Sequence, residues 1–319
     1  MGQEKITLTK AELKKVMVIE KLVAHQVKVV EAAELLGLSP PPGTAPQKRY
    51  IAEGAEGIAH KNRGRKPAHA IPEKVRKHVA ELYQSKYYGS NNIHFTELLQ
   101  EHESLEFSVS SVRRILLEHG IKQTKQKRHK KGHQPRIRKP QAGMLWQIDA
   151  SPYAWLEERG PELMLHGIID DATGMVVGAV FRPTETREGY FTAMKQAITH
   201  YGIPLGLYSD RHTIFRSPKE TLSIEQELAG ETVPLSQFGK AIAELGITHI
   251  KVRSPQAKGR IERLWGTFQD RLVIELRLLG VNSMDEANRV LPKLIQKHND
   301  RFAIKPKQAE SAYRSLPEE

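Results

Sequence analysis

The stretch MLWQID, residues 144–149, is a short apolar run that ends on an acid. Its length suits a buried strand rather than a helix. A second run, IPLGLYSD (203–210), has the same pattern and ends on Asp210. Strand ends are where α/β sheets place their sites, and a carboxylate among apolar strands is costly without a partner. The two runs therefore predict an α/β sheet with acidic chemistry at the ends of its strands.

Strand and helix patterns alternate around these two runs. Apolar segments predict three further strands, LMLHGIID (163–170), GMVVGAVF (174–181) and ITHIKV (247–252). Helical spacing predicts helices over 186–201, over 235–246, and from SPQAKGRIERLWGTF (254–268) to about Leu279. The resulting order, β-β-β-α-β-α-β-α, predicts an α/β domain with a mixed five-stranded sheet and helices.

Glu262 is a single acid in the basic segment that begins the last of these helices. It can be a surface ion-pair partner, which is the ordinary role of such a residue. It can also be a third ligand beside Asp149 and Asp210, because several carboxylates together can hold a divalent cation. Three carboxylates with one or two Mg²⁺ ions form an arrangement for phosphodiester chemistry.

Four other residues compete for roles at this site. Asp170 and Asp171 lead into the hairpin turn, where Asp is favoured for backbone reasons. His166 lies inside an expected strand, which favours a packed core residue over a ligand. His212 is two residues from Asp210 and can approach a phosphate.

The charge of the 319-residue chain is unevenly distributed. Residues 1–141 hold 27 Lys and Arg against 14 Glu and no Asp, whereas residues 142–319 hold 22 Lys and Arg against 23 acids. A basic half is typical of a surface for DNA or RNA. The chain has no cysteine, which excludes disulfides, thiolate metal sites and a Cys nucleophile. Without a signal peptide or membrane-spanning run, we expect a cytoplasmic, nucleoid-associated protein with no membrane partner.

Residues 1–67 are expected to form a helix-turn-helix-like DNA-binding module. The segment VVEAAELLGLS (29–39) predicts its first helix and turn, although an ordinary helical hairpin explains it nearly as well. The next stretch, PPPGTAPQKRY (40–50), cannot form an interior helix, so the recognition helix is expected to be disrupted at 40–47. Arg63 and Arg65 lie in HKNRGRKP (60–67), which suits either a DNA minor groove or a solvated linker.

A second helix-turn-helix module is expected over 68–121. Helices over 72–86, 94–102 and 108–120 place Arg113 and Arg114 on the exposed side of the third helix, where they can contact DNA. The basic linker 122–141 follows, and its first eighteen residues hold nine Lys or Arg and no acid. Such a run predicts an extended arm on DNA phosphates. The candidate contacts in this arm are Lys127, Arg128, Lys130 and Lys131.

Four motifs follow one another in the second half of the chain: WQIDASP (146–152), IIDDATG (168–174), LYSDRHTIF (207–215) and SPQAKGRIER (254–263). They resemble the integrase-core motifs of bacterial insertion-sequence transposases of the ISNCY-type group. The resemblance continues through HNDRFAIKP (298–306) and AYRSLP (312–317). It implies an RNase H-like DDE catalytic core over 142–281 and a helical C-terminal extension over 282–319. Longer relatives continue into a small β-rich domain, so a truncated C-terminus is expected.

The resemblance also implies a chemistry. A triad of Asp149, Asp210 and Glu262 would hold Mg²⁺ or Mn²⁺, with two ions expected, to nick transposon ends and transfer the strands into target DNA. Such enzymes generally act as homo-oligomers on DNA. DNA contacts near the site are implied for Lys258, Arg263, Arg211, His212 and Gln256. One alternative is a catalytically decayed or truncated remnant that acts as a repressor at transposon ends. Another is a structure-specific RNase H-like nuclease.

Overall fold

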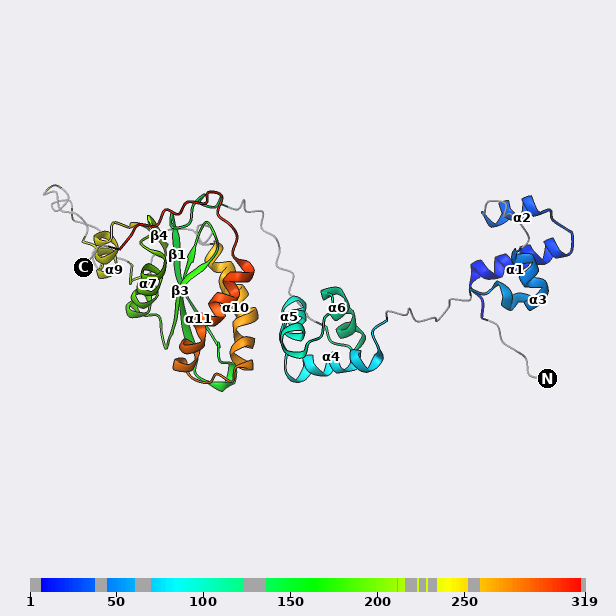
Figure 1. The fold of residues 1–319 in the computed structure, drawn as a ribbon, viewed down its shortest axis with the longest axis horizontal. Coiled ribbons are helices and arrows are strands. Elements are labelled where there is room, and N and C mark those ends of the chain that lie inside the picture. The colour runs from blue at the N-terminus through cyan, green and yellow to red at the C-terminus, as the bar shows by residue number, and fades with distance from the viewer. Residues whose placement is uncertain are drawn as a thin grey trace. The chain divides into compact units, whose positions relative to one another are not determined.

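A computed structural model describes residues 7–37, 45–60, 70–122, 136–210, 212–215, 234–251 and 259–316, together with residues 223 and 228. The chain divides into two compact units, residues 1–72 and 73–319. The described residues of the first unit form helices, and the second contains three helices followed by a sheet with helices on its faces (Figure 1). No helix in these described ranges is both long and apolar enough to cross a membrane.

The first unit is built on α1 (Lys10–Val23), which starts at a capping box. The backbone N–H of Glu12 donates to Thr9 Oγ1 at 3.3 Å, and the N–H of Thr9 donates back to the Glu12 carboxylate at 2.7 Å. Helix α2 (Val29–Leu36) ends at Gly37, whose φ of 65° is the left-handed conformation that glycine adopts without strain. The turn expected at Gly37 is therefore present.

A third helix, α3 (Ala45–Glu53), follows where the proline-rich stretch predicted none. That prediction is wrong for residues 45–50, whereas residues 38–44 lie outside the described residues. The reason is the position of Pro46, which is the second residue of α3. The first turn of a helix has backbone N–H groups without an intrahelical partner, so proline costs little there. Lys48 and Arg49 are exposed on α3.

The second unit begins with three helices, α4 (Glu73–Ser85), α5 (Asn92–Glu103) and α6 (Val109–Glu118). They match the three helices expected from the sequence, including the Ser108 cap and the stop at Gly120, whose φ is 75°. Their shared core is almost fully buried and consists of Val79, Tyr87, Phe95, Leu98, Leu99, Val112, Ile115 and Leu116.

A five-stranded sheet follows, in the order β3-β2-β1-β4-β5. Strands β1 (Trp146–Tyr153), β2 (Leu163–Asp170) and β3 (Val176–Arg182) are antiparallel, whereas β4 (Gly206–Ser209) and β5 (Thr248–Lys251) run parallel to β1. Helices α7 (Arg187–Tyr201) and α9 (Gln237–Glu244) bury one face, and α10 (Gly259–Leu278) and α11 (Met284–Phe302) bury the other (Figure 1). The predicted mixed sheet with RNase H-like architecture is confirmed.

Two details differ from the sequence-based expectation. Strand β1 continues for four residues beyond Asp149, because Ala150–Tyr153 pair with β2. Asp149 therefore lies within a strand rather than at its end, while Asp210 directly follows β4 as expected. Helix α11, from the expected C-terminal extension, packs Ala287 and Leu291 into the core shared with α10.

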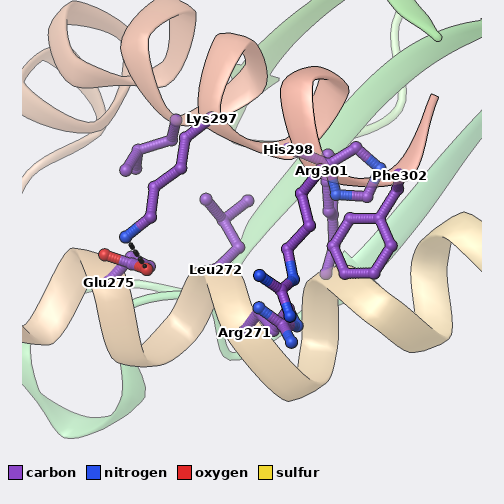
Figure 2. Close-up of a pocket in the computed structure, with 9 residues that line it drawn as sticks. Arg271, Leu272, Glu275, Lys297, His298, Arg301 and Phe302 are labelled. Atoms are coloured by element: carbon purple, nitrogen blue, oxygen red, sulfur yellow. Dashed lines mark hydrogen bonds and ion pairs between the residues drawn. The ribbon is translucent and has the colours of Figure 1, made fainter. Parts of the chain in front are cut away.

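Charged side chains join α5 to α10 and α11. The Glu97 carboxylate accepts hydrogen bonds from both terminal nitrogens of Arg271, at 2.7 and 3.1 Å, and also contacts Arg301. Figure 2 shows these two guanidinium groups close together in the groove between α10 and α11. Bidentate Arg–carboxylate contacts fix direction as well as distance. Glu97 therefore sets how α5 lies on this groove.

A second cluster in the same interface is centred on Glu275 of α10. Its Oε1 lies 2.8 Å from Lys297 Nζ, an ion pair drawn in Figure 2, and 3.3 Å from His94 Nε2 of α5. Burial raises the pKa of Glu275, but hydrogen bonds from His94 and Lys297 outweigh burial and lower it to about 2. The charged carboxylate is therefore stabilised strongly in the folded state.

This shift predicts an acid-labile interface. In the folded protein the pKa of Glu275 lies below its ordinary value of 4.5. Its contribution to the unfolding free energy is therefore complete above pH 4.5 and is lost as the pH falls to about 2. This contribution is on the order of 3 kcal/mol. We expect Glu275→Gln to remove that part of the pH dependence of the unfolding free energy, measured in urea at a series of pH values.

Glu101→Gln is the matched control for this prediction. Glu101 contacts the same Lys297 Nζ at 2.6 Å, but its side chain is 44% exposed. Exposed ion pairs contribute little, so the control should keep the wild-type pH profile. Equal flattening of the profile in both variants would contradict the assignment to Glu275.

Candidate active site

Asp149 and Asp210 lie on neighbouring parallel strands. Gln147 of β1 pairs with Tyr208 of β4, so continuing this register by two residues sets Asp149 beside Asp210. Adjacent strands are about 4.8 Å apart, which brings two carboxylates into one small region. Both residues are only partly buried, so their carboxylates remain accessible from solvent. The structure thus unites the two aspartates that the sequence selected.

Helix α10 reaches this region through Trp265. Its indole N–H donates to Asp149 Oδ2 at 3.1 Å, and its ring lies over Gly167, the β2 residue opposite Asp149. A Cβ atom on Gly167 would lie 2.6 Å from the ring, so the indole needs a glycine there. Trp265 therefore fixes one carboxylate oxygen of Asp149, and Gly167 provides the space for it.

The loop after β4 connects Asp210 to a fourth acid, Glu185. The backbone N–H of His212 donates to Asp210 Oδ1 at 2.9 Å, and its ring Nδ1 is 3.7 Å from Glu185 Oε1. The same Glu185 oxygen accepts the hydroxyl of Tyr190 at 2.6 Å. Burial raises the pKa of the Tyr190 hydroxyl, and the charges of Glu185, Asp149 and Asp210 raise it further. All three carboxylates thus act on one buried phenol.

Glu262 lies in the first turn of α10, one turn before Trp265, and is exposed. Arg263 is also exposed, and its Nε–H donates to the carbonyl of Gly259 at 2.8 Å, within its own helix. Among the described residues, no three His, Asp or Glu side chains lie close enough to bind one metal ion. Glu262 thus lies one turn from Trp265, which contacts Asp149, but the three acids do not form a three-ligand cluster in the described residues.

The competing acids Asp170 and Asp171 have structural partners instead. Asp170 accepts hydrogen bonds from the backbone N–H groups of Gly143 and Thr173, at 2.8 and 2.9 Å, and burial raises its pKa. Asp171 is fully buried and contacts Gln147 and the guanidinium groups of two arginines, Arg136 and Arg260. Their carboxylate oxygens thus have hydrogen-bond or ion-pair partners within the fold.

His166 is the core residue that its strand position favoured. It is fully buried, and burial lowers its pKa to about 4, so the ring is neutral near pH 7. Its Nε2 accepts the backbone N–H of Thr186 at 3.1 Å, just ahead of α7. The ring also packs edge-on against Tyr190, with the ring centroids 4.8 Å apart.

The remaining candidates fall into two groups. Arg113 and Arg114 are exposed on α6, as expected. The others lie outside the described residues and are Lys258, Gln256, Arg211, Arg63, Arg65, Lys127, Arg128, Lys130 and Lys131.

The contributions of Trp265 and Glu185 were not predicted from the sequence. The sequence pattern assigned Trp265 to the apolar stripe of its helix. Its indole N–H indicated a further role, because a buried indole N–H needs a hydrogen-bond acceptor. Glu185 precedes a helix, where an acid ordinarily satisfies the helix end. Its contact with His212 joins residues 27 positions apart in the chain, which no local pattern encodes.

Comparison with known proteins assigns the family. The chain is 36% identical, over a 330-residue alignment, to the transposase for insertion sequence IS1202 of Streptococcus pneumoniae, covering 93% of this chain and 69% of that protein. It is 34% identical over 311 residues to the transposase y4bF of Sinorhizobium fredii, covering 98% and 66%. The chain belongs to the bacterial insertion-sequence transposases. It spans about two thirds of the length of these relatives, and no protein-family model matches it.

Solved structures similar to this transposase include two retroviral assemblies. One is the HTLV-2 integrase catalytic core domain in complex with magnesium, at 21% identity and a TM-score of 0.36, covering 53% of this chain and 94% of that one. The other is a simian T-cell lymphotropic virus intasome in complex with PP2A regulatory subunit B56 gamma, at 22% identity and a TM-score of 0.36, covering 66% of each chain.

Two glycine-to-alanine substitutions in the transposase should have opposite effects on stability, because Gly167 contacts Trp265 whereas Gly266 has open space beside it. Gly167→Ala should displace the indole and lower the unfolding free energy by about 1–3 kcal/mol. Gly266→Ala lies in the middle of α10 with nothing within 4 Å of the added methyl group. It should raise the unfolding free energy by about 0.5–1 kcal/mol. Urea unfolding measures both, and a neutral Gly167→Ala would contradict the tight packing.

Proposed function

We propose that this transposase nicks DNA at transposon ends in a metal-dependent reaction and transfers the freed strands into target DNA. The observation that carries the proposal is the meeting of Asp149 and Asp210 on neighbouring strands, with Trp265 of α10 on Asp149 one turn after Glu262. Membership of the insertion-sequence transposases supports the same reaction.

The donor set suits Mg²⁺ or Mn²⁺. Asp149, Asp210 and Glu262 offer only carboxylate oxygens, which are the ligands that such hard cations select. The Glu262 side chain is exposed, so it is accessible to a cation from solvent. When bound, one or two cations would supply positive charge to the oxygens of an in-line phosphoryl displacement. We assign metal binding to these three residues.

The chain's own residues would position the DNA. We assign phosphate contacts near the site to Lys258, Arg263, Arg211, His212 and Gln256. His212 suits this role because its backbone N–H donates to Asp210 Oδ1, which places it beside that aspartate, and its ring Nδ1 lies 3.7 Å from Glu185 Oε1. Arg113 and Arg114 on α6, with the basic arm, would bind the phosphates of the transposon end. We also expect a homo-oligomer on DNA.

Glu262→Gln tests the metal assignment. Because Glu262 is exposed, the amide should not disturb the fold, yet it removes one anionic ligand. We expect nicking of a transposon-end duplex with Mg²⁺ to fall below detection while binding of the same duplex stays within about twofold. Glu244→Gln, an exposed acid on α9, should nick like the wild type.

The same assay separates the proposal from its alternatives. A variant Glu262→Gln that nicks at the wild-type rate would overturn the metal assignment. Wild-type protein that binds ends but never nicks them would favour a repressor. Cleavage of junctions or hybrids that lack transposon ends would favour a structure-specific nuclease.

Arg113 and Arg114 give a second prediction. Each phosphate contact releases counterions, so loss of one contact reduces the salt dependence of DNA binding in proportion. We expect Arg113→Ala and Arg114→Ala each to lower the slope of log K against log salt by about 1. Fluorescence anisotropy measures it. Lys195→Ala, an exposed cation on α7, should leave the slope unchanged, and an unchanged slope in both Arg variants would remove α6 from the interface.

A further inference from the structure

The buried amide of Gln147 connects the strand of Asp149 to the helix of Glu262. Its Oε1 accepts the backbone N–H of Ile261 at 3.3 Å, and its Nε2 donates to Asp171 Oδ1 at 2.8 Å. Ile261 lies in the first turn of α10, where backbone N–H groups have no partner within the helix. Gln147 therefore holds the helix end directly beside Glu262.

Asp171 holds the same helix end from the hairpin turn. Its carboxylate lies 3.2 Å from Nε of Arg260, the residue that precedes Ile261, and its backbone carbonyl accepts from the same nitrogen at 3.1 Å. Asp171 and Gln147 are fully buried, and Arg260 is nearly so. Two consecutive residues of α10 are thus fixed to the sheet by buried polar contacts.

The last residues of the basic arm complete this arrangement. Arg136 contacts the Asp171 carboxylate through its guanidinium, and the backbone N–H of Lys139 donates to Asp171 Oδ2 at 2.9 Å. The backbone carbonyl of Arg136 also accepts from Arg260 Nη2 at 3.2 Å. The arm end and the first turn of α10 therefore share one buried carboxylate.

We propose that Gln147 and Asp171 are positioning residues that hold the first turn of α10, which carries Glu262, against the sheet, and that the arm end at Arg136 completes their site. The proposal rests on the proposed function, because it takes Glu262 as a metal ligand. A ligand on the first turn of a helix keeps its place only if that turn is fixed to the scaffold. Trp265 fixes the following turn, so the first turn depends on Gln147 and Asp171.

Metal affinity of the full-length protein provides the test. We would measure Mn²⁺ binding by calorimetry in the absence of DNA, and thermal unfolding without metal. Gln147→Met keeps the length of the side chain but removes both hydrogen bonds. We expect it to weaken Mn²⁺ binding about tenfold or more, as loss of an outer partner of a metal ligand does. Asp171→Asn should weaken binding in the same direction.

Gln269→Met is the matched control. Gln269 donates to Ser151 Oγ at 3.5 Å, so it also links α10 to β1 through an amide, but about two turns beyond Glu262. It should shift the unfolding temperature without changing Mn²⁺ affinity. For the arm, Arg136→Met should weaken Mn²⁺ binding more than Arg138→Met, since Arg138 donates to the backbone carbonyls of Asp171 and Ala172, whereas Arg136 contacts the Asp171 carboxylate.

The outcomes are distinct. Wild-type Mn²⁺ affinity in Gln147→Met and Asp171→Asn, or equal weakening in Gln269→Met, would overturn the positioning role alone. Equal affinity in the two arm variants would remove Arg136 from it. If the wild type does not bind Mn²⁺, or if Asp149→Asn binds Mn²⁺ as tightly as the wild type, the proposed function fails as well.

Discussion

The contacts of the buried Asp171 carboxylate hold together three segments of the second unit. A charged group without solvent contact is tolerated only when it is paired and hydrogen-bonded. Here the partners come from three segments far apart in the chain, Arg136 of the arm, Gln147 of β1 and Arg260 of α10. Loss of the carboxylate would leave two cations without their shared partner, and breaking a buried pair in this way costs about 3–5 kcal/mol.

The spacing of helix and strand explains why α10 can follow β1 so closely. Alternate residues of β1 share a face, and Gln147, Asp149 and Ser151 face α10 while Trp146 and Ile148 lie in the core under α7. These three residues bond in turn to Ile261, Trp265 and Gln269, which are four positions apart along α10. Four helical residues rise about 6.0 Å and two strand residues about 6.6 Å, so the contacts stay in register.

The sequence predicted most of this framework because its signals were local. Apolar runs located all five strands, and Ser108 and Gly120 marked the ends of a helix. The extent of β1 beyond Asp149 was not predictable from its own residues, since Pro152 argues against a strand interior and only pairing with β2 extends it. Helix α3 was missed because proline was weighed as a helix breaker without knowing that Pro46 begins the helix.

The candidate site was predictable only in part, for a physical reason. Asp149, Asp210 and Glu262 were selected by residue type and by resemblance, but the roles of Trp265, Gln147 and Glu185 depend on tertiary contacts. The same limit applied to Asp170 and Asp171, whose carboxylates differ from that of Asp149 only in their surroundings. Protein donors surround Asp170 and Asp171, whereas Asp149 keeps access to water.

Helix α10 contacts α5 on one flank and the strand of Asp149 on the other. Glu262 and Arg271 are nine residues apart, which is about two and a half helical turns, so they lie on opposite flanks. The Arg271 flank binds α5 through Glu97, while the Glu262 flank borders Asp149 through Trp265. Helix α5 therefore contacts the flank of α10 opposite Glu262, and the Glu262 side chain is exposed.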